Sequence, residues 1–157
     1  MKILLINPSS YEVYGGLPPS FQIPLGLAYI ASIVENAGYA VEIIDIGTEN
    51  LTEHQFVKKI EGINPDIVGI TCTTPVYSNA VKIAEIVKKT SNAVTVLGGI
   101  HSTIVPEESI KPSSIDIVVK GEGEKTFLEL LKCIETRDDL LKVNGIVFKR
   151  NDKIITT

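Results

Sequence analysis

The stretch Val96-Leu97-Gly98-Gly99-Ile100-His101-Ser102-Thr103 sets the pattern for the whole chain. An apolar run ends in two adjacent glycines and then in a polar cluster, as a buried strand does when it leaves a sheet. Glycine pairs allow backbone conformations that other residues avoid, and they let a bulky ligand lie against the main chain. The same stretch also fits an ordinary turn between a strand and a helix. The remaining strand ends are needed to choose between these interpretations.

Short apolar runs alternate with helix-length segments along most of the chain. The runs predict five strands, at residues 2–7, 41–45, 67–70, 94–97 and 115–119. Apolar residues at helical spacing predict helices at 24–37, 52–60, 80–87 and 126–134, with a short one near 106–108. This alternation predicts an α/β fold: a Rossmann- or flavodoxin-like five-stranded parallel sheet with helices on both faces.

The end of the chain has a different pattern. Residues 145–150 and 153–156 flank an Asn151-Asp152 turn, which predicts a C-terminal β-hairpin. We expect residues 1–142 to form the α/β domain. Residues 143–157 would form the hairpin, at the start of a linker to another domain.

The unusual loops all follow strands. They are residues 7–23, 71–75, 98–103 and 121–124, and the first is too long for an ordinary connection. Right-handed crossovers bring such loops to one edge of a parallel sheet, where open α/β sheets bind ligands. We therefore expect a binding site at that edge.

Composition excludes several classes of function. The chain has 157 residues, 44% of them hydrophobic, with a net charge of −4 and scattered basic residues. Nucleic-acid binding needs a positive patch, and a membrane span needs about 20 apolar residues; neither is present in the sequence. The two cysteines, Cys72 and Cys133, lack the spacing of metal ligands and suggest a reducing, cytoplasmic setting.

Familiar phosphate-binding motifs do not fit. A dinucleotide site would need G-x-G-x-x-G after the first strand, where the chain has Asn7-Pro8-Ser9-Ser10. Gly121-Glu122-Gly123-Glu124-Lys125-Thr126 lacks the spacer of a phosphate loop, and its acids would repel phosphate. Those acids equally suit the start of a helix. A phosphoacceptor receiver domain would have acids where Asn7 and Thr71 stand.

His101 is the most conspicuous single candidate for a functional residue. It could be a metal ligand, a hydrogen-bonding group or an ordinary loop residue. No acid or cysteine stands at coordinating spacing, so we predict no metal site. No combination of residues predicts catalysis in this chain either. The sequence indicates a binding module for a large and mostly neutral ligand.

Several segments together resemble a known family: the cobalamin (B12)-binding domain that precedes the catalytic domain of many radical S-adenosylmethionine enzymes, including the anaerobic magnesium-protoporphyrin IX monomethyl ester cyclase group. The resemblance runs from Met1 to about Phe148. It rests on Asn7-Pro8, Pro24-Leu25-Gly26-Leu27-Ala28-Tyr29-Ile30-Ala31-Ser32, Pro65-Asp66-Ile67-Val68-Gly69-Ile70-Thr71, residues 96–103, Pro106-Glu107-Glu108 and residues 121–124.

The resemblance implies a corrin over the carboxyl edge of the sheet and a nucleotide tail in a slot between strands and helices. Gly98 and Gly99 would let the tail pass. Thr71, Thr73 and Thr74 would hydrogen-bond tail or corrin amides, Gly121-Glu122-Gly123 would border the dimethylbenzimidazole pocket, and the loop 8–23 would cover the corrin. The full set of expected cofactor-binding residues is Asn7, Pro8, Ser9, Thr71, Cys72, Thr73, Thr74, Gly98, Gly99, His101, Gly121, Glu122 and Gly123.

Two departures refine this expectation. The Asp-x-His-x-x-Gly motif of other cobalamin proteins is missing from residues 7–12, which read Asn-Pro-Ser-Ser-Tyr-Glu. Cobalamin would therefore bind base-off, without a protein histidine on the cobalt. The Cys-x-x-x-Cys-x-x-Cys motif is also missing, so a 4Fe–4S cluster and S-adenosylmethionine are expected only in a further, C-terminal domain. The chain looks like an N-terminal piece of a longer enzyme, and a natural stand-alone domain stays open.

Three hypotheses follow. The first is the cobalamin-binding domain of a radical S-adenosylmethionine methyltransferase, or of a cyclase acting on a tetrapyrrole-like substrate. The second is a docking or lid module of such an enzyme with no bound cobalamin. The third is a flavodoxin-like binder of another small ligand, such as a flavin. The evidence for it is limited to Ser9 and Ser10.

Overall fold

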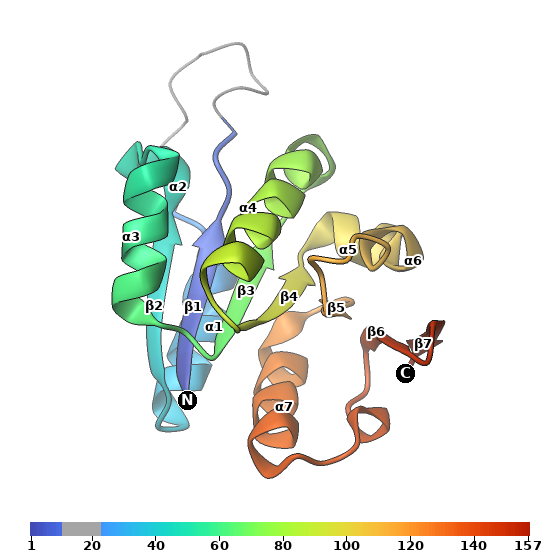
Figure 1. Ribbon diagram of the computed structural model, residues 1–157. Coiled ribbons are helices and arrows are strands. Elements are labelled where there is room, and N and C mark those ends of the chain that lie inside the picture. Colours follow the sequence, from blue (N-terminus) through green and yellow to red (C-terminus); the bar gives the residue numbers. More distant parts are fainter. Residues whose placement is uncertain (11–22) are drawn as a thin grey trace.

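The computed structural model describes residues 1–10 and 23–157 and has one seven-stranded sheet in the order β2-β1-β3-β4-β5-β6-β7 (Figure 1). Five strands are parallel: β1 (Lys2–Asn7), β2 (Ala40–Asp45), β3 (Ile67–Thr71), β4 (Val94–Gly98) and β5 (Ile117–Val119). The predicted α/β class is confirmed. The strand order reverses between β1 and β3, which places the expected ligand crevice at their carboxyl ends.

The C-terminal hairpin extends the sheet. Strand β6 (Ile146–Arg150) pairs antiparallel with β5, and β7 (Lys153–Thr156) pairs with β6. Asn151 and Asp152 both have positive φ, as a tight two-residue hairpin turn requires. The predicted hairpin is confirmed. The local sequence pattern did not predict that the hairpin pairs with β5.

Four helices cover the two faces of the sheet (Figure 1). Helices α1 (Leu25–Asn36) and α7 (Gly123–Thr136) pack on one face, and α3 (Glu53–Ile63) and α4 (Tyr77–Thr90) pack on the other. The remaining helical turns are short: α2 (Ile46–Glu49), η1 (Thr74–Val76), α5 (Ile100–Ile104), α6 (Pro106–Ser109) and η2 (Leu140–Lys142). Within the described residues, no helix has the length and apolar character needed to cross a membrane.

Local signals explain the ends of α1 and the start of α3. Helix α1 starts after Pro24 and ends before Gly38, whose φ is +91°. Helix α3 begins with a capping box: the Gln55 N–H donates to Thr52 Oγ1, and the Gln55 side chain accepts from the Thr52 N–H.

Two predicted loops are partly helical. The segment 98–103 becomes helix α5 from Ile100, and α7 begins at Gly123 within the predicted loop 121–124. In the first case the Thr103 hydroxyl donates to the Gly99 carbonyl at 3.0 Å, beside the main-chain bond from Thr103 N–H at 3.1 Å. These bonds turn the chain helical directly after the glycine pair.

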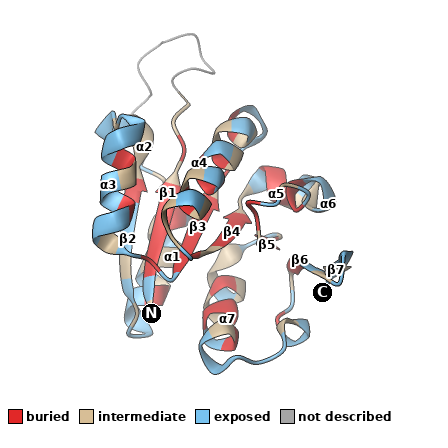
Figure 2. Ribbon diagram, in the orientation of Figure 1, coloured by how far each residue is buried: buried red, intermediate tan, exposed pale blue. Residues whose placement is uncertain are grey.

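The core lies on both faces of the central strands (Figure 2). In β1, Leu4 and Ile6 join the cluster under α3 and α4, while Ile3 and Leu5 join the cluster under α1 and α7. Burial on both sides is why the parallel strands have continuous apolar sequences. The central strands are thereby fixed, and their carboxyl ends form a rigid base for the site.

The hairpin should contribute to the stability of the whole domain. Phe148 is 2% exposed and packs in the cluster that contains Ile117, whereas Ile154 on the same hairpin is 42% exposed. Phe148→Ala should lower the free energy of unfolding by about 3–5 kcal/mol, and Ile154→Ala by less than about 1 kcal/mol. Urea unfolding of the two variants measures this difference. Equal, small losses would mean that the hairpin folds apart from the sheet.

Candidate functional site

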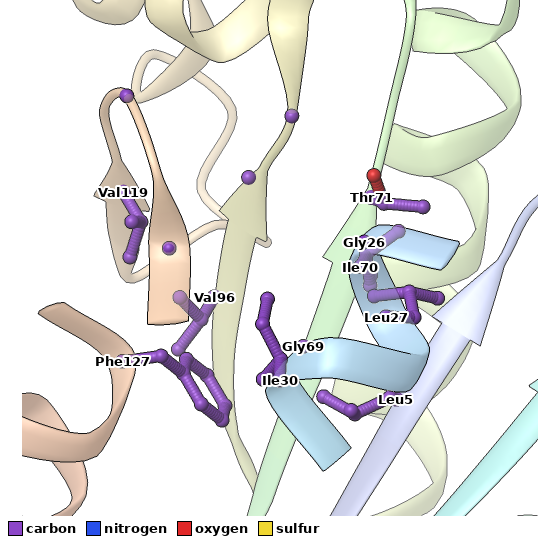
Figure 3. Close-up of a pocket in the computed structure, with 14 residues that line it drawn as sticks. Leu5, Gly26, Leu27, Ile30, Gly69, Ile70, Thr71, Val96, Val119 and Phe127 are labelled. Atoms are coloured by element: carbon purple, nitrogen blue, oxygen red, sulfur yellow. The ribbon is translucent and has the colours of Figure 1, made fainter. Parts of the chain in front are cut away.

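Two adjoining cavities open at the carboxyl edge of the sheet. The first, which we call the slot, has a volume of about 110 Å³ and lies between the sheet face and helices α1 and α7 (Figure 3). The second, the edge cleft, has a volume of about 520 Å³ and lies over the ends of β1, β2 and β3. Gly26, Leu27 and Thr71 line both cavities, so the slot and the edge cleft lie side by side.

The slot is lined by glycines and apolar side chains. Its glycines are residues 26, 69, 98, 99, 121 and 123, and Thr71 is the one polar side chain among its described lining residues. The apolar members come from both helices and four strands; they are Leu5, Leu27, Ile30, Ile70, Val96, Val119 and Phe127. Such a surface can hold an apolar group but has no ionisable side chain for acid–base chemistry.

Two of the glycines are required by close packing. Gly99 has a φ of +96°, and a Cβ there would lie 2.6 Å from the Cys72 carbonyl oxygen and 2.9 Å from Thr71 Oγ1. At Gly69, a Cβ would lie 2.8 Å from Leu5 Cδ2. Strand β3 therefore allows neighbouring groups to reach its backbone, and the exits of β3 and β4 lie close together.

Three other glycines border open space. A Cβ added at Gly26, Gly98 or Gly121 would meet no protein atom within 4 Å. Because these residues also line the slot, the missing side chains leave room that a ligand would fill. A tail that passes close to the main chain, as a cobalamin nucleotide tail would, fits this arrangement.

Thr103 connects the two glycine loops at the mouth of the slot. Its hydroxyl donates to the Gly99 carbonyl at 3.0 Å and accepts from the Gly121 N–H at 2.9 Å. This bridge fixes the spacing between the end of β4 and the start of α7. Thr103 belonged to the motif that suggested the family but was not predicted as a site residue.

The edge cleft presents polar groups that are held in place. Asn7 Nδ2 donates to Asp45 Oδ2 at 3.1 Å, and Asp45 Oδ1 accepts from the Thr48 N–H at 3.0 Å. Cys72 also lines the cleft, and burial raises the pKa of its thiol. The thiol is therefore protonated at neutral pH, whereas metal ligation needs the thiolate.

His101 lines neither cavity. It is 9% exposed, its ring lies 4.2 Å from the Tyr77 ring between centroids, and its Nδ1 is 3.2 Å from Thr74 Oγ1. Its Nε2 is buried without a hydrogen-bond partner among the described residues. Burial lowers the pKa of the imidazole, which favours the neutral form. The side chain joins α5 to the start of α4.

The predicted site residues are thus partly brought together. Thr71, Gly98, Gly99, Gly121 and Gly123 line the slot, and Asn7, Pro8, Thr71, Cys72 and Thr73 line the edge cleft. The other four predicted residues line neither cavity; they are Ser9, Thr74, His101 and Glu122. Of the loop expected to cover the corrin, residues 11–22 lie outside the described residues.

Sequence reasoning missed most of the apolar wall of the slot. Leu5, Ile30 and Phe127 meet there only because the sheet and two helices pack together. A signal existed at Gly69, since a glycine inside an apolar strand often marks close approach of another group. Gly26, a glycine in the first turn of a predicted helix, was a similar signal.

Nothing in the described part of the chain gathers metal ligands. Across residues 1–10 and 23–157, no group of three or more His, Cys, Asp or Glu side chains is placed to hold a metal ion.

Comparison with known proteins gives a consistent result. The family model of the B12 binding domain matches residues 12–131. The chain is 40% identical over 156 residues to an uncharacterized methyltransferase of Pyrococcus horikoshii, covering 98% of this chain and 34% of that protein. It is 35% identical over 168 residues to the anaerobic magnesium-protoporphyrin IX monomethyl ester cyclase of Rubrivivax gelatinosus, covering 100% of this chain and 29% of that protein.

A solved structure shares the fold. The radical S-adenosylmethionine methyltransferase TsrM from Kitasatospora setae, with cobalamin and a 4Fe–4S cluster bound, matches with a TM-score of 0.85. The sequence identity is 22%, and the match covers 99% of this chain and 28% of that chain. The chain thus spans about a third of the length of the curated relatives that it matches.

The two neighbouring glycines at the end of β4 should respond very differently to substitution. Gly99→Ala would place a Cβ against the Cys72 main chain at positive φ, which should cost roughly 2–5 kcal/mol of unfolding free energy. Gly98→Ala adds a Cβ in open space and should change stability by less than about 1 kcal/mol. Chemical denaturation of both variants gives the comparison. A harmless Gly99→Ala would contradict the packing described here.

His101 should make the fold sensitive to mild acid. Burial lowers its pKa in the folded state, so the unfolded chain binds the proton more readily and stability falls as pH drops below about 6.5. His101→Phe should reduce the loss of unfolding free energy between about pH 7 and pH 5. The unmodified chain, measured over the same pH range, is the reference. An identical pH profile for His101→Phe and the unmodified chain would contradict a buried neutral His101.

Proposed function

This chain belongs to the B12-binding domain family, and from that premise we propose that it binds cobalamin base-off, without a protein histidine on the cobalt, as one domain of a longer radical S-adenosylmethionine enzyme. The observation that carries the proposal is that the edge cleft and the slot are neighbours and share Gly26, Leu27 and Thr71 in their linings. A broad cleft at the sheet edge suits a flat macrocycle. A narrow apolar slot beside it suits the base at the end of the tail once that base has left the cobalt.

The residues of the chain would bind and orient the cofactor. Gly98 and Gly99 would let the tail run along the main chain, and Thr71, where slot and cleft meet, would hydrogen-bond it. Asn7 and Thr73 line the cleft, where the corrin amides would lie. When bound, cobalamin supplies a cobalt centre that can carry a methyl group, while the protein supplies position and environment.

The positions of the two histidines support binding without a protein ligand on the cobalt. His101 packs against Tyr77 outside both cavities, and His54 is exposed in the first turn of α3. Neither lines the cleft over which the corrin would sit. Cys72 does line it, but as a protonated thiol it is a poor metal ligand.

The activity of the whole protein requires a second inference, which rests on its relatives. Because relatives are named as methyltransferases or as an anaerobic magnesium-protoporphyrin cyclase, we infer methyl transfer or anaerobic oxidative cyclisation of a tetrapyrrole-like substrate for the whole enzyme. The 4Fe–4S cluster and S-adenosylmethionine would be held by a C-terminal radical S-adenosylmethionine domain of the same chain. The hairpin of residues 143–157 belongs to the sheet of this domain, and the linker to the next domain would start there, in a cytoplasmic enzyme.

One observation favours a second candidate, a docking module without cofactor. Ile100 and Ile104, which follow the glycine pair, are 55% and 67% exposed, and exposed apolar residues near a cavity suit a covering domain. A measurement of cobalamin binding separates the two candidates.

The slot can be blocked without harming the fold. Gly26 in α1 and Gly62 in α3 both lie in helices, and a Cβ at either meets no atom within 4 Å. Leucine is the better helix former by about 0.8 kcal/mol, so Gly26→Leu and Gly62→Leu should both fold. Of the two introduced leucines, only the one that replaces Gly26 would enter the slot, because Gly62 does not line it.

The experiment is a titration with hydroxocobalamin, followed by gel filtration and visible absorption of the protein peak. We expect the unmodified chain and Gly62→Leu to retain a base-off spectrum, and Gly26→Leu to bind at least about tenfold more weakly. No retention by a chain with an intact circular-dichroism spectrum would favour the docking module. Equal binding by both variants would show that the tail of the cofactor does not enter the slot.

A further inference from the structure

The edge cleft has an uneven distribution of charge. Among its described lining residues, Asp45 carries the one carboxylate, and there is no Lys, Arg or His side chain. The other polar side chains in that lining are hydroxyl, amide and thiol groups. A carboxylate in such a place binds N–H donors and repels other anions. The cleft therefore favours a ligand whose surface offers neutral donors.

The Asp45 side chain is held in one orientation. Asp45 ends β2, where it pairs with Asn7 at the end of β1, and the two strands lie side by side (Figure 1). One carboxylate oxygen accepts from the Thr48 N–H at 3.0 Å, and the other accepts from Asn7 Nδ2 at 3.1 Å. Because strand pairing and two hydrogen bonds fix the group, it is positioned before any ligand arrives.

The carboxylate can still accept further hydrogen bonds. A carboxylate has about four lone-pair sites, and within the described residues no other hydrogen bond reaches the Asp45 side chain. Gly47 has no side chain to cover it: a Cβ there would lie 3.6 Å from Asp45 Oδ1. The remaining lone pairs are thus available to a donor on a ligand in the cleft.

Asn7 adds a second acceptor beside Asp45. A carboxylate only accepts hydrogen bonds, so the Asn7 amide must turn its nitrogen toward Asp45 and its oxygen away from it. Asn7 also lines the cleft, and its oxygen has no donor among the described residues. The pair therefore presents several acceptors and a single remaining side-chain N–H. A primary amide, with two N–H donors and one acceptor, matches this arrangement, whereas a carboxylate offers acceptors alone.

We propose that Asp45, oriented by Asn7, is a specificity-determining residue of the edge cleft: it accepts a hydrogen bond from a peripheral propionamide of the corrinoid and discriminates against a carboxylate in that position. This inference rests on the proposed function, because it concerns the ring of the same cofactor. The propionamides of a corrin lie on the side of its lower base, which is the side that would face the sheet edge. A propionate there would meet Asp45 as a like charge, with no cation in the described lining to balance it.

The test compares hydroxocobalamin with its three monocarboxylic acids, in each of which one propionamide is hydrolysed to a propionate. The tail, the base and the cobalt are the same in all of them. Equilibrium dialysis with visible absorption measures the affinities, and a salt concentration of about 1 M shortens the Debye length to about 3 Å, so that the net charge of the chain contributes little. We expect one acid to bind at least about tenfold more weakly than hydroxocobalamin, and the other two within about threefold of it.

Two matched variants assign the discrimination to Asp45. Asp45→Asn removes the charge and keeps the shape, and Asn suits the N-cap position of α2 as well as Asp does. It should narrow the preference for hydroxocobalamin over the disfavoured acid at least about fivefold. Asp152→Asn makes the same change in the exposed turn of the hairpin, at a positive φ that Asn also adopts, and should leave the preference unchanged. Circular dichroism checks that both variants fold.

The outcomes separate this inference from the function on which it rests. If hydroxocobalamin is not retained, the proposed function fails. If hydroxocobalamin is retained but the three acids bind alike, the chain binds the cofactor and Asp45 does not recognise its periphery. An equal change of preference in Asp45→Asn and Asp152→Asn, or no change in either, would also overturn the role of Asp45. Because the preference is a ratio of two affinities, a variant that merely weakens the site leaves it unchanged.

Discussion

The packing of the Gly99 main chain against Cys72 is the contact on which the carboxyl edge of this sheet depends. It exists because Gly99 has no side chain and a φ of +96°. The Cys72 N–H then donates to the Gly98 carbonyl, and the Cys72 carbonyl accepts from the His101 N–H. With β3 and β4 held together at their exits, Thr71 and Gly98 face the slot, and Thr103 can reach across to Gly121. One close approach of two backbones thus organises three loops.

The same edge suits binding rather than catalysis. The described lining of the slot has no ionisable side chain, and the edge cleft fixes Asp45 by bonds to Asn7 and to the start of α2. These are features of a surface that holds a large group in one orientation. A cofactor that brings its own reactivity needs this kind of support from the protein.

Local sequence patterns were sufficient for the fold class, the five parallel strands and the C-terminal hairpin. Each of these depends on residues close together in the chain. The pairing of β6 with β5, and the start of α7 at Gly123, depend on contacts between distant segments, and the pattern of apolar residues does not contain them.

The candidate site also has residues that the sequence pattern reveals and residues that it does not. Glycines at strand ends, such as Gly98, Gly99 and Gly121, were recognisable because their positions are unusual for a strand exit. Phe127 and Ile30 belong to apolar patterns that predict helices, and such a pattern indicates that a side chain is buried but not what lies opposite it. Gly69 belongs to both groups. The sequence shows its place in an apolar strand, but not that Leu5 and Phe127 pack beside it.

The central claim is that the lower base leaves the cobalt and that no histidine of this chain replaces it. Electron paramagnetic resonance of the chain loaded with cob(II)alamin tests this directly, because a nitrogen atom bound axially to the cobalt splits the cobalt lines. The account predicts a base-off spectrum without nitrogen superhyperfine splitting. A spectrum with that splitting would place the base or a histidine on the cobalt, and would contradict both the slot as the seat of the base and His101 as a packing residue.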